Sequence, residues 1–120
     1  MKILIADDSR VMRQIVTRTL RQAGFDGHDL VEACDGRDAY DKFMAEKPDL
    51  VVSDWNMPEM TGIELLRGLR SAGQAVPFGF VTSECTEEMK STAEAAGALF
   101  FIVKPFTSDG FRDALSPLLG

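Results

Sequence analysis

The chain has 120 residues, of which 45% are hydrophobic and 27% charged, and its net charge is −6 at pH 7. This length and composition indicate one globular domain, residues 1–120, with a single core. A general nucleic-acid-binding protein would normally be basic, and no apolar stretch approaches the ~20 residues that cross a bilayer. The apolar N-terminus is too short for a signal peptide. We therefore expect a cytoplasmic monomer that binds neither nucleic acid nor membrane.

Five short apolar runs predict buried β-strands, at 3–6, 30–33, 50–53, 78–82 and 100–103. Each run is followed by apolar residues at helical spacing, which predict five helices. These stripes comprise Met12, Ile15, Val16, Thr19, Leu20 and Ala23; Ala39, Tyr40, Phe43 and Met44; Ile63, Leu66 and Leu69; Met89, Ala93 and Ala96; and Phe111, Ala114, Leu115 and Leu118.

Cap and stop signals bound these helices. They are Asp8 or Ser9, Thr61 or Gly62, and Thr86 at helix starts, Gly24, Gly73 and Gly97 at helix ends, and Pro48 after the second helix. Gly36 predicts a turn, and Gly79 within a strand predicts a close backbone approach. Pro117 should kink or fray the last helix. The fourth stripe is thin, so we expect its helix to be held weakly.

Strands that alternate with helices imply parallel pairing with right-handed crossovers, that is, an α/β fold with helices on both faces of one sheet. Ligands of such sheets bind beyond the carboxyl ends of the strands. Reactive or charged groups follow four of the five strands, namely Asp7 and Asp8, Asp54, Thr82 and Lys104. A carboxylate such as Asp54 at this edge can act as a nucleophile or a metal ligand.

Four segments carry a family resemblance: Ala-Asp-Asp-Ser at 6–9, Ser-Asp-Trp-Asn-Met-Pro at 53–58, Val-Thr-Ser-Glu at 81–84 and Val-Lys-Pro-Phe-Thr at 103–107. In order and spacing they resemble the receiver domain of bacterial response regulators, and closely its CheY-like single-domain chemotaxis members. The resemblance covers essentially the whole chain. It implies a doubly wound (βα)5 flavodoxin-like fold with strand order 2-1-3-4-5.

That strand order makes the geometry testable. The third strand would lie between the first and the fourth, which places Asp54 between Asp8 and Thr82. The fifth strand would lie roughly 10 Å from the third, so only a long side chain such as Lys104 could reach Asp54.

The cysteines and the histidine offer no alternative metal or redox site. Cys34 and Cys85 lack a CxxC spacing, and in this strand order their strands would lie roughly 14 Å apart, too far for a disulfide. A single histidine cannot build a histidine-rich site, and we expect His28 at the surface.

Three carboxylates, Asp7, Asp8 and Asp54, would share one pocket. Each like-charged pair at about 5 Å costs on the order of 3 kcal/mol at an effective dielectric near 20, and one lysine offsets only part of this. A hard divalent cation would neutralise this repulsion between the carboxylates, and Mg²⁺ prefers oxygen ligands. The resemblance implies that Mg²⁺ is held by Asp8, Asp54 and the backbone carbonyl of Asn56, with Asp7 binding directly or through water.

The resemblance also implies the chemistry. Asp54 would accept a phosphoryl group from a phosphohistidine of a CheA-like histidine kinase, with Lys104 and Thr82 neutralising the phosphoryl oxygens. Thr82 would then move toward the phosphate and Phe101 would swing into the vacated space. In this family that position is often Tyr, so a partner contact through its hydroxyl is absent here.

The resemblance also makes predictions about residues around the site and about the kind of protein. Asn56, Ser83 and Glu84 would tune the lifetime of the phosphorylated state, and the peptide bond between Lys104 and Pro105 would be cis, although sequence alone favours trans. We expect a signalling switch rather than an enzyme, which assists its own phosphorylation and dephosphorylation.

We expect no output domain after the receiver, so the signal would pass by protein binding. The expected partners are the kinase, a downstream target such as the flagellar motor switch, and a phosphatase. The alternative is a phosphorelay shuttle or phosphate sink between histidine phosphotransfer proteins. An aspartyl phosphatase would need a second carboxylate where Asn56 stands, and a flavin module would need a Ser-, Thr- and Gly-rich loop where Asp7 and Asp8 stand.

Overall fold

The computed structural model describes residues 1–25 and 27–119. Strands and helices alternate throughout, as predicted, and each strand matches its predicted bounds to within one residue. In chain order the elements are β1 (Lys2–Ala6), α1 (Arg10–Gln22), β2 (Asp29–Ala33), α2 (Gly36–Glu46), β3 (Leu50–Ser53), α3 (Gly62–Ser71), β4 (Phe78–Thr82), α4 (Glu87–Ala95), β5 (Phe100–Val103) and α5 (Ser108–Leu119).

The five strands form one sheet of order β2-β1-β3-β4-β5, and every neighbouring pair is parallel, which confirms the expected topology. The register places Ala6 of β1 opposite Ser53 of β3, and Ser53 opposite Phe80 of β4. The residues that follow these strands therefore emerge at the same edge of the sheet.

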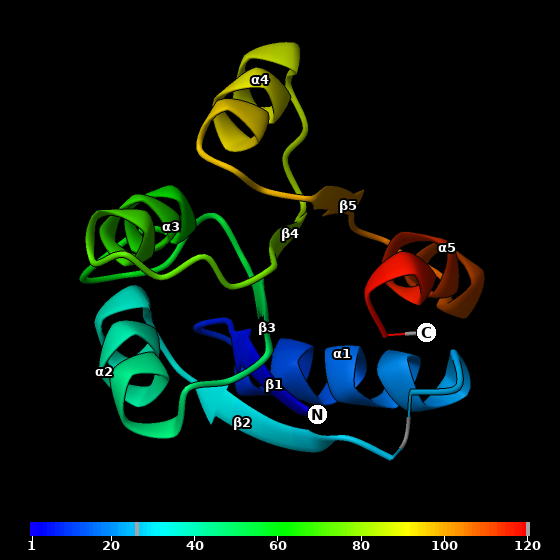
Figure 1. The fold of residues 1–120 in the computed structure, drawn as a ribbon. Helices are drawn as coiled ribbons and strands as arrows, with labels where there is room; N and C mark the ends of the chain where they lie inside the picture. Colours follow the sequence, from blue (N-terminus) through cyan, green and yellow to red (C-terminus); the bar gives the residue numbers. More distant parts are fainter. Residues whose placement is uncertain (26, 120) are drawn as a thin grey trace.

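The sheet divides the hydrophobic core into two clusters. Along β1, Leu4 and Ala6 belong to the cluster beneath α2, α3 and α4, whereas Ile3 and Ile5 belong to the cluster beneath α1 and α5. Figure 1 shows the same division, with α2, α3 and α4 on one side of the sheet and α1 and α5 on the other. Because both faces are covered, the central strands β1, β3 and β4 are largely continuous apolar runs, whereas the edge strand β2 carries Asp29 and Glu32.

Three predicted N-caps are confirmed. The hydroxyls of Ser9, Thr61 and Thr86 accept hydrogen bonds from the backbone three residues on, and at Thr61 the Glu64 carboxylate completes a capping box. The only buried residue of α4 is Ala93, in keeping with the weak hold expected for this helix.

Three local predictions have different outcomes. Gly36 is not a turn residue but the first residue of α2, capped by Asp35, and a Cβ at this position would collide with the backbone of Met60. Gly79 is the close approach that was predicted, because the Phe100 ring lies where its Cβ would be. Pro117 does not fray α5, which continues through it to Leu119.

The remaining outcomes concern side-chain exposure and membrane spans. His28 is half-buried near Phe25 rather than at the surface. Cys34 and Cys85 form no disulfide, as expected, and both are exposed. Over residues 1–25 and 27–119, no helix combines the length and apolar character that a membrane span requires.

Candidate functional site

The first three strands bring the predicted carboxylates together. The Asp7 backbone N–H donates to the Ala33 carbonyl at 3.1 Å and the Asp54 N–H donates to the Ala6 carbonyl at 2.8 Å, so parallel pairing continues to the residues that end the strands. Carboxylate oxygens of Asp7, Asp8 and Asp54 lie within 4.8 Å of one another. We call these three residues the acidic cluster.

Lys104 enters the acidic cluster from β5. Its Nζ lies 3.3 Å from Asp7 Oδ2 and 3.5 Å from Asp54 Oδ2. The side chains of all three residues are largely buried, at 16%, 5% and 12% exposure for Lys104, Asp7 and Asp54. The long stem of the lysine spans the distance from the edge strand as the sequence predicted, and the Lys104–Pro105 peptide bond is cis, as expected.

Backbone amides hold the two inner carboxylates in place. The Trp55 N–H donates to Asp54 Oδ1 at 2.7 Å, and the Ser9 N–H donates to Asp7 Oδ1 at 2.9 Å. In both residues Oδ1 faces a backbone amide and Oδ2 faces Lys104. The carboxylates are therefore oriented before any ligand arrives.

Electrostatics single out Asp7 within the cluster. Burial raises the pKa of its carboxyl above the ordinary value, and the nearby Asp54 carboxylate raises it further. The Ser9 N–H and the Lys104 ammonium act in the opposite direction but do not cancel the effect of burial. The site thus holds more negative charge than its one lysine offsets.

The structure positions the other predicted residues along the same edge. Thr82 is fully buried at the end of β4, where its hydroxyl accepts from the Glu84 N–H at 3.4 Å and its carbonyl accepts from the Lys104 N–H at 2.8 Å. The Asn56 amide donates to the Glu84 carboxylate at 3.3 Å. Asn56, Ser83 and Glu84 are exposed, so they can meet solvent near the cluster.

An aromatic group links Asp54 to Phe101, a connection that sequence reasoning did not identify. The Trp55 ring lies 4.9 Å from Phe80 and 6.2 Å from Phe101, and Phe80 lies 6.1 Å from Phe101, measured between ring centroids. The Trp55 backbone thus holds the Asp54 carboxylate while its ring contacts the predicted switch residue. Sequence alone offered only adjacency to Asp54 as a signal.

Arg13 is the second feature that the sequence did not reveal. Its Nη1 donates to the Asp7 carbonyl at 2.7 Å and its Nε pairs with Glu32 Oε1 at 2.9 Å, although the residue lies in α1 and outside the apolar stripe. The Arg13 side chain is only 14% exposed. It therefore ties the segment after β1 to β2.

The donor set of the acidic cluster fits a hard divalent cation. All available ligand atoms are oxygens, the three carboxylates exceed the single ammonium in charge, and Asp8 is exposed and open to water. These properties match the preference of Mg²⁺ for a few carboxylates with retained waters.

Comparisons with known proteins agree with this geometry. The family model "Response regulator receiver domain" matches residues 3–116. Chemotaxis protein CheY1 of Helicobacter pylori (strain ATCC 700392 / 26695) is 38% identical, with 100% of this chain and 98% of the relative covered. The chemotaxis protein CheY homolog of Campylobacter jejuni subsp. jejuni is 39% identical, with 100% and 93% covered.

A solved structure gives the same result. The structure of Vibrio cholerae chemotaxis protein CheY4, crystallised at low pH, has a TM-score of 0.85 and 37% identity, with 98% of each chain covered. The family match, the relatives and the shared fold lead to one conclusion: the chain belongs to the family of response regulator receiver domains.

Proposed function

We propose that this protein is a phosphorylation-activated response regulator of two-component signalling and that Asp54 is its phosphoacceptor. The observation that carries the proposal is the position of the Lys104 ammonium, which lies within 3.5 Å of both Asp7 and Asp54 inside a cluster of three carboxylates. Phosphoryl transfer depends mainly on positioning and on neutralising charge, and this arrangement supplies both.

In the proposed reaction an oxygen of the Asp54 carboxylate attacks phosphorus. An O–P bond forms, the P–N bond of the donor phosphohistidine breaks, and its electron pair stays on the imidazole nitrogen. Lys104 and the Thr82 hydroxyl would stabilise the charge on the phosphoryl oxygens. The product is an acyl phosphate, which water hydrolyses to restore Asp54.

The residues that would hold Mg²⁺ are Asp7, Asp8, Asp54 and, through its backbone carbonyl, Asn56. When bound, the cation would neutralise the surplus carboxylate charge and that of the phosphoryl group. Asn56, Ser83 and Glu84 would set the lifetime of the acyl phosphate by controlling the approach of water, and their exposed position supports this role.

Thr82 and Phe101 would convert phosphorylation into a change of surface. Thr82 is fully buried at the end of β4, and Phe101 is half-buried in contact with the ring of Trp55. Movement of the Thr82 hydroxyl toward a phosphate would open space for Phe101 and reposition α4, the helix with the fewest buried residues.

The names of the relatives support a role in chemotaxis, because both relatives described above are chemotaxis proteins. We propose a CheA-like histidine kinase as the phosphodonor and a downstream protein such as the flagellar motor switch as the target. A phosphatase would remove the phosphoryl group from Asp54. Residues 1–120 would act as one signalling unit rather than as an enzyme of external substrates. The expected location in the cytoplasm remains a prediction.

Direct phosphorylation tests the assignment. The purified chain is incubated with Mg²⁺ and acetyl phosphate, and its intact mass is measured. We expect one added phosphoryl group on the wild type and on Asp41→Asn, a matched control in an exposed residue of α2, and none on Asp54→Asn. Equal phosphorylation of Asp54→Asn, or none of the wild type under any donor, contradicts the proposal.

Partner capture tests the biological role. Immobilised chain, phosphorylated or carrying Asp54→Asn, is exposed to purified chemotaxis kinase, motor-switch protein and histidine phosphotransfer protein. Phosphorylation-dependent capture of the motor-switch protein is the expected result. Efficient return of the phosphoryl group to a histidine phosphotransfer protein, without motor-switch binding, would favour the shuttle instead.

A further inference from the structure

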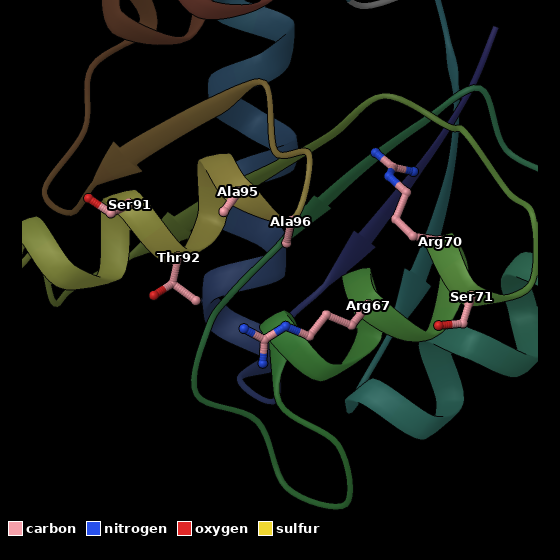
Figure 2. Close-up of a pocket in the computed structure, with 7 residues that line it drawn as sticks. All are labelled: Arg67, Arg70, Ser71, Ser91, Thr92, Ala95 and Ala96. Carbon is pink, nitrogen blue, oxygen red and sulfur yellow. The ribbon is translucent and has the colours of Figure 1, made fainter.

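A groove of about 700 Å³ lies between α3 and α4, and none of its lining residues belongs to the acidic cluster. One wall comes from the C-terminal half of α3, and the other runs from the middle of α4 to its C-cap, Ala96 (Figure 2). The lining residues are Arg67, Arg70, Ser71, Ser91, Thr92, Ala95 and Ala96. The proposed phosphorylation chemistry uses none of them, so this groove is unassigned.

The lining has the opposite charge to the protein as a whole. It contains two arginines and three hydroxyl-bearing residues but no carboxylate, whereas the chain has a net charge of −6. Ala95 and Ala96 have small side chains that leave room between the helices. A polar groove of this kind favours an anion that accepts hydrogen bonds.

Arg70 is held in position before any ligand arrives. Its Nη1 donates to the Gln74 carbonyl at 2.9 Å and its Nη2 donates to the Gly97 carbonyl at 3.3 Å, so it joins the C-terminal ends of α3 and α4. The guanidinium offsets the partial negative charge of those helix ends. A guanidinium has five N–H donors, so others remain for a ligand.

Arg67 is the more available of the two cations. It is exposed, and within residues 1–25 and 27–119 it forms no ion pair. In Figure 2 its side chain extends from α3 toward the space beneath Ala96, while Thr92 lies on the facing side of the groove. Its fork of donors suits bidentate contact with a phosphate.

We propose that this groove binds the phosphate moiety of a small, soluble organic phosphate of about nucleotide size. The volume falls within the range typical of small-molecule sites, roughly 300–1,000 Å³, and far exceeds that of a single inorganic anion. Arg67 and Arg70 bind the phosphate oxygens, and the hydroxyls of Ser71 and Ser91 complete the contacts. Thr92 lines the groove without donating to the ligand, because its hydroxyl donates to the Glu88 carbonyl at 2.8 Å.

The proposed ligand would touch α3 and α4 together. Because Ala93 is the only buried residue of α4, a bridging ligand would restrain the helix that is otherwise held least. The groove is independent of the phosphoacceptor, so its test needs neither Mg²⁺ nor a phosphodonor, and the two proposals can fail separately.

Calorimetry and amide chemical-shift mapping on the full chain test the inference. ATP, chosen as a polyphosphate probe, and inorganic phosphate are titrated in low-salt, metal-free buffer. ATP should bind more tightly than phosphate, shift amides of α3 and α4, and weaken as salt is added. Arg67→Gln should weaken ATP binding about tenfold or more, which is the effect of losing one charge-assisted contact.

Arg37→Gln is the matched control, because it removes the same charge from an exposed position on α2. Equal weakening in both variants would show attraction to net charge alone and would overturn the proposal. It also fails if ATP does not bind at millimolar concentration, if phosphate binds as tightly as ATP, or if the shifts centre on the acidic cluster. If the protein binds anionic phospholipid vesicles through Arg67 and does not bind ATP, the ligand is a membrane lipid, which contradicts a soluble phosphate.

Discussion

Asp7 is the most buried carboxylate of the acidic cluster. Its side chain is 5% exposed and burial raises its pKa. Above the raised pKa the carboxyl is ionised in both the folded and the unfolded chain, so folding must bury a charge. Below the unfolded value the group is neutral in both states and that cost disappears. In the absence of metal, Asp7 therefore destabilises the folded state at neutral pH.

Asp7→Asn tests this reasoning. We expect the metal-free variant to be more stable than the wild type at about pH 7, and the difference to shrink as the pH falls toward about 4, near the ordinary pKa of aspartate. The free energy of unfolding, measured with urea at each pH, checks the expectation. A difference that is constant or grows with acidity would show that burial of the Asp7 charge is not the cause.

Arg13 should affect both stability and metal binding. Arg13→Ala leaves the Asp7 carbonyl and the Glu32 carboxylate without their partner, so we expect a loss of about 1–3 kcal/mol in the free energy of unfolding. We also expect weaker Mg²⁺ binding, monitored by fluorescence of Trp55, because the segment after β1 loses its tether. Arg13→Lys should recover part of both properties. Unchanged Mg²⁺ affinity in the Ala variant would limit the role of Arg13 to folding.

At the scale of secondary structure, two glycines make a matched pair. A Cβ at Gly79 would overlap the Phe100 ring, whereas a Cβ at Gly68 in α3 would lie 3.6 Å from the Tyr40 ring, an ordinary contact. Gly79→Ala should destabilise the protein by about 1–3 kcal/mol. Gly68→Ala should stabilise it by about 0.5–1 kcal/mol, because alanine favours a helix. Thermal or urea unfolding measures the stability change in both variants. Equal changes in the free energy of unfolding would contradict the packing argument.

The sequence predicted those elements whose signals are local. Apolar runs located all five strands, and Ser9, Thr61 and Thr86 located helix starts, because periodicity and capping act within a few residues. The edge residues Asp7, Asp54 and Lys104 followed from topology once the strand order was known.

The features that the sequence missed depend on distant segments. Gly36 looked like a turn signal because the backbone of Met60, which excludes a side chain there, lies far along the chain. The contacts of Arg13 have no local signal, because its partners are Asp7, which follows β1, and Glu32 on β2. Pro117 was expected to kink or fray the helix because the low helix propensity of proline applies to a helix interior. This proline instead lies two residues before the last helical position, Leu119.

For the molecule as a whole, surplus charge at one edge links stability to metal binding. A ligand that binds only the folded state stabilises it by about 2.7 kcal/mol at 100 times its dissociation constant. We therefore expect Mg²⁺ to raise the unfolding temperature of the wild type, and to do so much less in Asp8→Asn, whose exposed side chain does not hold the core. Sodium chloride at matched ionic strength separates binding from screening. Equal stabilisation by both salts would argue against a specific site.

The division of the core by the sheet has a consequence for how a signal can spread. Trp55, Phe78, Phe80 and Phe101 all pack with the cluster on the α2, α3 and α4 side, whereas Phe111 and Leu115 anchor α5 on the other. A rearrangement that begins at Asp54 can therefore be accommodated on one side while the opposite layer keeps its packing. The exposed surface of α1 and α5 would then keep its shape before and after phosphorylation, and we expect a protein that recognises both states to bind there.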